Sequence, residues 1–103
     1  MTKALLQVNF SIKISRSEFE KAAAPLAVVI ANASGAMWKI WSINEDTKEV
    51  AGFYLFEDKS SAQRFVVGEI ADGIRKHPAV NNPTMKIFEV MEDLTRVTRG
   101  PIS

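Results

Sequence analysis

Hydrophobic and polar residues alternate along residues 4–12, near the start of the chain. Leu6, Val8, Phe10 and Ile12 point to one side, and Gln7, Asn9 and Ser11 to the other. A period of two is typical of a β-strand with one buried face, because successive side chains point to opposite sides of a sheet. We therefore predict a half-buried strand here.

The segment that follows has the spacing of a helix. Ser15 with Glu18, and Ser17 with Glu20, both fit a capping box, in which a hydroxyl and a carboxylate satisfy free N–H groups at a helix start. Apolar residues then recur every three or four positions: Phe19, Ala22 or Ala23, Leu26 and Ile30. Pro25 would disturb a helix interior, so it predicts either a kink or a late helix start.

A β-hairpin is predicted after this helix, which should end within residues 32–35 with Gly35 in the left-handed conformation. Residues 37–41 and about 49–57 are rich in aromatic and β-branched side chains, which favour strands. Residues 44–48 between them are polar and are expected to form the hairpin loop.

The second half of the chain predicts one more helix and one more strand. The helix would be capped by Asp58 or Ser60 and would end at His77 and Pro78. Its inward face would carry Ala62, Phe65, Val66, Ile70 and Ile74. Residues 81–83 are expected to be a loop and residues 84–91 a strand. Residues 92–103 form a polar segment that we expect to be an extended tail running over a surface.

The predicted order of elements is therefore β-α-β-β-α-β within one domain, residues 1–103. Two βα units joined through a central hairpin are typical of the split-βαβ, ferredoxin-like α+β plait. In that plait both helices pack on one face of a four-stranded antiparallel sheet.

Composition narrows the class of protein. The chain has 103 residues, a net charge of +1 and interspersed charges, which is not the electrostatic pattern of a nucleic-acid-binding protein. It has no cysteine, no signal-peptide pattern and no apolar run long enough to cross a membrane. We expect a cytoplasmic protein without nucleic-acid or membrane partners.

Both faces of the hairpin strands are apolar, and this predicts a homodimer. Val50, Tyr54 and Phe56 alternate with Ala51, Phe53 and Leu55 along one strand. The helices of the plait cover only one sheet face, so the other face would expose a large apolar patch. A second copy docked sheet to sheet across a two-fold axis would cover that patch.

Several stretches resemble the YdhR-type putative mono-oxygenases of the dimeric α+β barrel superfamily. They are WKIW at residues 38–41, AGFYLF at 51–56, DKSSA at 58–62 and KIFEV at 86–90, with LLQV at 5–8 and EDL at 92–94. The stretches occur in the family's order and cover most of the chain. The resemblance implies a dimeric α+β barrel, in which two plaits join their sheets.

The resemblance also implies oxidation of an aromatic or quinol-like compound by molecular oxygen, without a cofactor. Such chemistry needs an apolar pocket, a base or hydrogen-bond partner for a phenol, and exclusion of water. Tyr54, His77 and Asn9 are the candidate catalytic residues, with His77 as a base because its ordinary pKa is near neutrality. The candidate substrate-binding residues are Trp38, Trp41, Phe53 and Phe65.

Each candidate also has an ordinary structural role. His77 stands at a helix end, where a cation favours the helix dipole, and Asn9 fits a solvated or interface position. Tyr54 fits a buried core position with its hydroxyl reaching a partner. Trp38 and Trp41 are three residues apart and should face opposite sides of the sheet, so only one of them can line a given pocket.

The residues favour no metal or nucleotide cofactor. A single histidine without cysteine makes a poor metal site, and no glycine-rich phosphate loop supports NAD or FAD. A non-enzymatic ligand-binding dimer is the main alternative function. Haem degradation is a third function, because this chain resembles the haem-degrading dimeric α+β barrels in having an Asn on the first strand and a His near the end of the second helix, here Asn9 and His77. Those barrels also have a Trp on that helix, where this chain offers only Phe65.

Overall fold

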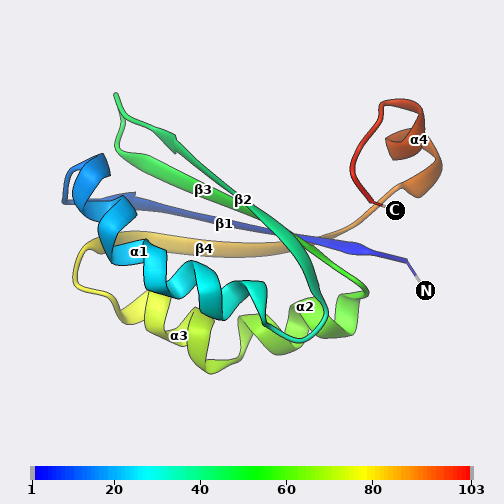
Figure 1. The fold of residues 1–103 in the computed structure, drawn as a ribbon, viewed down its shortest axis with the longest axis horizontal. Helices are drawn as coiled ribbons and strands as arrows, with labels where there is room; N and C mark the ends of the chain where they lie inside the picture. Colours follow the sequence, from blue (N-terminus) through cyan, green and yellow to red (C-terminus); the bar gives the residue numbers. More distant parts are fainter. Residues whose placement is uncertain (1, 103) are drawn as a thin grey trace.

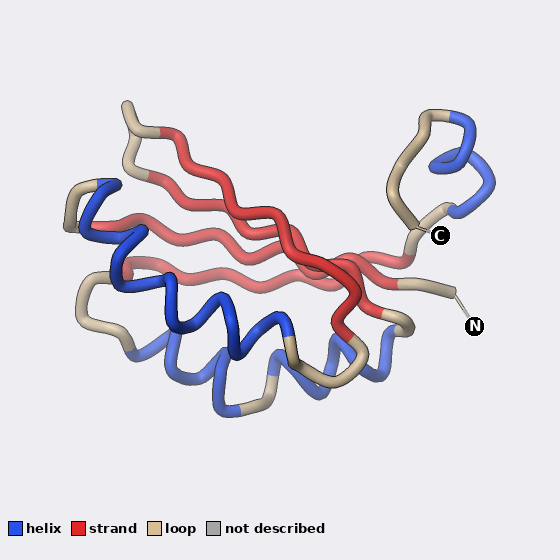
Figure 2. Tube along the Cα trace, in the orientation of Figure 1, coloured by secondary structure: helices blue, strands red, loops and turns tan. Residues whose placement is uncertain are grey.

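Four antiparallel strands form the sheet of the protein in a computed structural model that describes residues 2–102 (Figure 1). The elements are β1 (Ala4–Ile12), α1 (Arg16–Ala31), β2 (Ala36–Asn44), β3 (Glu49–Phe56), α2 (Lys59–Val66), α3 (Glu69–Lys76), β4 (Val80–Glu89) and α4 (Glu92–Val97). The strand order is β2-β3-β1-β4. Helices α1, α2 and α3 lie on the same side of the sheet (Figure 2). The predicted ferredoxin-like α+β plait is confirmed.

Helix α1 begins where the first capping box predicts. The backbone N–H of Glu18 donates to Oγ of Ser15 (3.1 Å), and the backbone N–H of Ser15 donates to the Glu18 carboxylate (3.2 Å). The helix starts well before Pro25 and continues past it to Ala31, so the expectation of a late start is wrong. Gly35 follows the helix with φ +79°, as predicted, and a side chain there would collide with Ser61.

The second predicted helix is two shorter helices. The Asp58 carboxylate caps α2 by accepting from the backbone N–H of Ser61 (2.8 Å). The chain leaves the helical conformation after Val67, and Gly68 is the N-cap of α3. The prediction of a single helix is therefore wrong. Glycine is a poor helix former, so the helix can break at Gly68. His77 is the C-cap of α3, which is the predicted end.

Strand β4 starts earlier than predicted. Residues 81–83, expected to be a loop, belong to the strand, which runs from Val80 to Glu89. The pairing with β1 is irregular here, because the register shifts between Asn9 and Ser11. Pro83 has no N–H to donate to a neighbouring strand. The register shift and the position of β4 at the edge of the sheet both accommodate this proline.

The expectation of an extended tail over residues 92–103 is wrong, because its first part is helix α4. The tail is anchored at both ends. The backbone N–H of Lys3 donates to the Glu92 carboxylate (3.0 Å), and Nε1 of Trp38 donates to the carbonyl of Pro101 (2.7 Å). Ile102 is buried against Leu55 and Val90.

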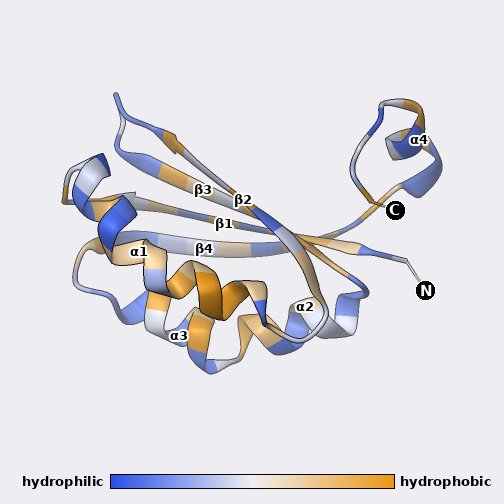
Figure 3. Ribbon diagram, in the orientation of Figure 1, coloured by the Kyte–Doolittle hydropathy of each residue, from blue (hydrophilic) through white to orange (hydrophobic). Residues whose placement is uncertain are grey.

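The two faces of the sheet separate as the alternating pattern predicts. Even-numbered residues of β1 and β3, including Leu6, Val8, Tyr54 and Phe56, are buried beneath the helices with Phe65. The other face carries Trp38, Ile40, Phe53 and Phe88. Ile40, Phe53 and Phe88 remain 52%, 37% and 47% exposed. Figure 3 shows further apolar residues along α1 and α3. The prediction that both faces of the hairpin strands are apolar is confirmed.

Within residues 2–102, no helix is both long enough and apolar enough to span a lipid bilayer.

Candidate active site

A cavity of about 480 Å³ lies between the helix-covered face of the sheet and helices α1 and α3. Its volume falls in the range of roughly 300–1,000 Å³ that is typical of small-molecule sites. Its walls are mostly apolar: Val8, Phe10, Ile12, Phe19, Leu26, Trp41, Val50, Ile70 and Ile74 are among the lining residues.

The cavity exists because several positions that face it are small. Helix α1 presents Ala22 and Ala23, α3 presents Gly73, and β3 presents Gly52. A side chain at Gly73 would meet no atom within 4 Å. Larger side chains at these positions would fill the space in the way that protein cores are normally filled.

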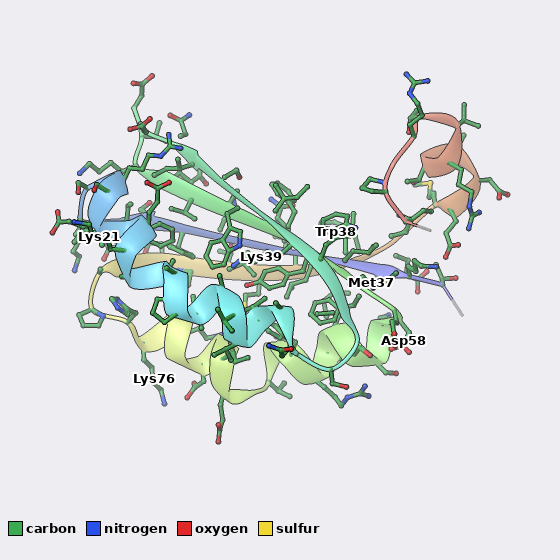
Figure 4. The ribbon with its side chains drawn as sticks, viewed as in Figure 1. Lys21, Met37, Trp38, Lys39, Asp58 and Lys76 are labelled. Atoms are coloured by element: carbon green, nitrogen blue, oxygen red, sulfur yellow. The ribbon has the colours of Figure 1, made fainter. Side chains whose placement is uncertain are left out.

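Lys39 brings an amine into this apolar space from β2 (Figure 4). Its Nζ lies 3.3 Å from the ring centroid of Trp41 and 4.5 Å from that of Tyr54. Gly52 leaves the room for it, since a Cβ at Gly52 would lie 3.0 Å from Cε of Lys39. None of the ion pairs formed within residues 2–102 involves Lys39.

Burial lowers the pKa of Lys39 from its ordinary value of 10.5 to about 7. The physical cause is desolvation, because the ammonium ion loses its water shell in the cavity and gains no ion pair within residues 2–102. The faces of the two rings return part of that lost stabilisation through cation–π attraction. The result is an amine that is substantially neutral near physiological pH and can accept a proton.

Tyr54 lines the cavity from β3 and pairs with Lys39 across the β2–β3 ladder. Its side chain is fully buried, and its hydroxyl has no hydrogen-bond partner among residues 2–102. Its ring is held by Phe65, at 5.0 Å between centroids, and by Phe56, at 6.0 Å. Burial raises the pKa of Tyr54, so the hydroxyl stays protonated and keeps its O–H donor.

Two further polar residues, Glu69 and His77, line the cavity from α3 and its C-terminal cap. Both are exposed, so they stand at the rim rather than in the interior. Nδ1 of His77 accepts a hydrogen bond from the backbone N–H of Ala79 (3.1 Å). This bond leaves Nε2 as the ring nitrogen that can face a ligand.

The structure brings some of the predicted site residues together and separates others. Tyr54, His77 and Trp41 line the cavity. Phe65 packs behind the Tyr54 ring instead of lining the space. The prediction that Trp38 and Trp41 face opposite sides is confirmed by their pairing with Leu55 and Gly52.

The remaining candidates, Trp38, Phe53 and Asn9, lie on the sheet face opposite the cavity. Asn9 accepts a hydrogen bond from the side chain of Gln7 (2.8 Å) on that face. Within residues 2–102, the cavity that His77 lines is not lined by Asn9, which separates the two residues on which the haem-degrading alternative depended.

Lys39 was missed in the sequence analysis. The signal was present, because Lys39 is a charged residue at an inward position, two residues before Trp41. A lysine in that position usually extends its amine back to water, so the pattern alone does not distinguish a buried amine from a solvated one. Among residues 2–102, no group of three or more acidic or histidine side chains could hold a metal ion.

Comparison with known proteins identifies the family. The sequence model of the family described as "Putative mono-oxygenase ydhR" matches residues 5–101. No curated protein matches this chain.

Several solved structures share the fold. A mutant of SnoaB, a cofactor-independent oxygenase from Streptomyces nogalater, is 14% identical with a TM-score of 0.70, over 89% of this chain and 96% of that chain. NE2512, a protein of unknown function from Nitrosomonas europaea, is 22% identical with a TM-score of 0.64, over 88% and 91%. A putative antibiotic biosynthesis monooxygenase from Bacillus cereus is 12% identical with a TM-score of 0.62, over 88% and 95%. At these identities the structures show a common fold alone. Because the family model spans nearly the whole chain, the protein belongs to the family described as "Putative mono-oxygenase ydhR".

Proposed function

We propose that the protein is a cofactor-independent mono-oxygenase that oxidises a small aromatic or quinol-like substrate with molecular oxygen in the cavity beneath α1. One observation carries the proposal: an apolar cavity of about 480 Å³ contains an amine and is lined by a tyrosine whose buried hydroxyl has no hydrogen-bond partner among residues 2–102. A buried hydroxyl without a partner costs roughly 1–3 kcal/mol. A ligand oxygen that accepts from it would remove that cost.

The proposed substrate supplies all the electrons. In an anthrone-type tricycle, loss of a proton from the central CH₂ gives an electron-rich anion that is an oxyanion in its other resonance form. This anion adds to O₂ and forms a C–O bond, and the resulting peroxide anion takes up a proton to give a hydroperoxide. Loss of the second C–H proton and cleavage of the O–O bond then give a ketone and one molecule of water. One O₂ is consumed per substrate, and no external reductant is needed.

The walls of the cavity suit this chemistry. Trp41 and Phe19 offer flat apolar surfaces against which a planar ring system can pack. Excluding water protects a reactive anion and hydroperoxide from side reactions. The hydroxyl of Tyr54, which stays protonated, would donate to the substrate oxygen where negative charge develops.

Oxygen consumption by chelator-treated protein tests the proposal directly, with anthrone and a hydroquinone as substrates. We expect uptake above a heat-denatured control, with one O₂ consumed for each anthraquinone formed. Tyr54→Phe should lower the rate at least tenfold while leaving the protein folded, because the ring packing on Phe65 is retained. Absence of uptake with both substrates would contradict the proposal and favour the alternative, a non-enzymatic ligand-binding module.

We also propose that two copies pair through the sheet face that α1, α2 and α3 leave uncovered. Ile40, Phe53 and Phe88 are partly exposed on this face. A hollow of about 530 Å³ adjoins them, lined by Trp38, Leu94 and other apolar residues of the sheet and the C-terminal segment. Burying such a surface is the main driving force for association.

Sedimentation measures the assembly. We expect about twice the chain mass of 11.4 kDa. Phe53→Glu should shift the protein to monomer, because it places a charge in the proposed interface. Val67→Glu is the matched control, since Val67 is 82% exposed at the end of α2 on the helix side. A stable wild-type monomer would contradict the proposal.

A further inference from the structure

Lys39 brings an amine to the cavity, and Tyr54 lines the same cavity with a buried hydroxyl that has no hydrogen-bond partner among residues 2–102. The two residues are direct neighbours across β2 and β3. The Lys39 amine lies over the rings of Trp41 and Tyr54 and forms no ion pair within residues 2–102. A ligand that satisfies both must bring an acceptor, and an oxyanion is the acceptor that interacts most strongly with such donors.

The other titratable groups that line the cavity cannot replace this pair in its interior. Glu69 and His77 come from α3 and its cap and are exposed at the rim. The residues that α1, β1 and β4 contribute to the lining, such as Phe19, Val8 and Val80, carry no titratable group. Lys39 is therefore the basic group inside the apolar part of the cavity.

We propose that the cavity binds its ligand as an oxyanion: a planar aromatic molecule whose acidic hydroxyl transfers its proton to Nζ of Lys39. The aryl–OH bond loses its proton, the amine becomes an ammonium ion, and the phenolate oxygen accepts hydrogen bonds from Lys39 and Tyr54. The ring system lies against Trp41. This inference rests on the proposed function, since it names the substrate class and the proton acceptor of the same site.

The geometry explains why a lysine is kept in an apolar cavity. The two aromatic faces stabilise the ammonium form of Lys39 through cation–π attraction, and after proton transfer this ammonium gains a counter-ion at close range. An ion pair in a low-dielectric space is stronger than in water. The protein would thus favour the ionised form of the ligand, which is the form that reacts with O₂.

A coloured phenol reports this proton transfer without any oxidation. The probe is 4-nitrophenol, whose phenolate is yellow, and the control is 4-nitroanisole, a methyl ether that cannot ionise. We expect wild-type protein at pH 7 to bind 4-nitrophenol with a phenolate band stronger than that of the same concentration of free 4-nitrophenol. The bound phenol should titrate at least one pH unit below free phenol, and 4-nitroanisole should bind at least tenfold more weakly.

Variants identify the proton acceptor. Lys39→Met should abolish this gain in the phenolate band, and Tyr54→Phe should weaken phenolate binding at least threefold. Lys21→Met, an exposed lysine on α1, should match wild type. The inference is overturned if Lys39→Met keeps the gain, if His77→Ala removes it instead, if the ether binds as well as the phenol, or if the phenol does not bind.

The two proposals can fail separately. Phenolate binding without oxygen uptake would contradict the oxygenase and leave the oxyanion site standing. Oxygen uptake that survives Lys39→Met, with no gain in the phenolate band in wild type, would contradict the oxyanion site and leave the oxygenase standing.

Discussion

Replacing Lys39 with methionine should stabilise the protein in a pH-dependent way. Methionine has a similar length and no charge, so it fills the same space above Gly52 without the cost of a buried ammonium ion. The pKa of Lys39 is about 7 in the folded protein and 10.5 as its ordinary value. At about 1.4 kcal/mol per pH unit, this difference in pKa corresponds to at most about 5 kcal/mol in the free energy of unfolding.

The sign follows from which state holds the proton. Between about pH 7 and pH 10.5 the unfolded chain keeps the Lys39 proton and the folded protein has released it, so the wild-type free energy of unfolding rises with pH. Below about pH 7 both states hold the proton, and the cost of burying the charge is fully present. The stabilisation by Lys39→Met should therefore be largest below pH 7 and should shrink as the pH rises.

For a fully buried amine, the stability advantage of Lys39→Met, measured as the difference in the free energy of unfolding, should fall by about 2 kcal/mol between pH 7 and pH 9. Lys39 is only partly buried, so we expect the advantage of the variant to fall by about 1–2 kcal/mol over this interval. For a domain of this size, that corresponds to a difference in Tm of roughly 4–16 °C.

Urea unfolding of the wild type and the variant at pH 6, 7, 8 and 9 measures this difference. Circular dichroism is the suitable signal, because Trp41 fluorescence would itself respond to the substitution. The protein concentration is held constant, since dissociation of a dimer makes stability concentration-dependent. Lys21→Met, on the exposed side of α1, should show no comparable trend. A Lys39→Met advantage that stays constant within about 0.3 kcal/mol from pH 7 to pH 9 would refute the reasoning.

Three further predictions concern single positions. Gly52→Ala places a Cβ 3.0 Å from Cε of Lys39, so we expect a folded protein with at least threefold weaker 4-nitrophenol binding, measured by absorbance titration. Ser15→Ala removes the hydroxyl of the capping box and should lower the free energy of unfolding by about 1 kcal/mol in urea titrations; no change would mean that α1 needs no cap. Gly35→Ala should lower the Tm by at least 5 °C, because its φ of +79° costs alanine roughly 1–2 kcal/mol and the new methyl collides with Ser61. A calorimetric scan that matches wild type would contradict the last prediction.

Local patterns in the sequence determined most of the architecture. Alternation along β1 and β3 assigned each residue to a sheet face, because strand geometry repeats every two residues. The same rule placed Trp38 and Trp41 on opposite faces. The Ser15 capping box located the start of α1, because the interaction involves residues only three positions apart.

The fold of the tail depends on contacts between residues that are far apart in the chain. Helix α4 was missed because the tail is anchored by such contacts. Pro101 contacts Trp38, and Ile102 packs against Leu55. Asn9 stays an untested candidate catalytic residue, and its side chain lies on the face of β1 opposite the cavity.

Only the tertiary structure determines that a cavity forms and that the amine of Lys39 lies inside it. A period of two places Lys39 on the inward face, yet it does not say whether the amine reaches water. That depends on Gly52, which gives it room, and on Ala22 and Ala23 of α1, which leave the space above it unfilled. Desolvation depends on all the atoms around a group, so the lowered pKa of Lys39 appears only when α1, β2 and β3 are packed together.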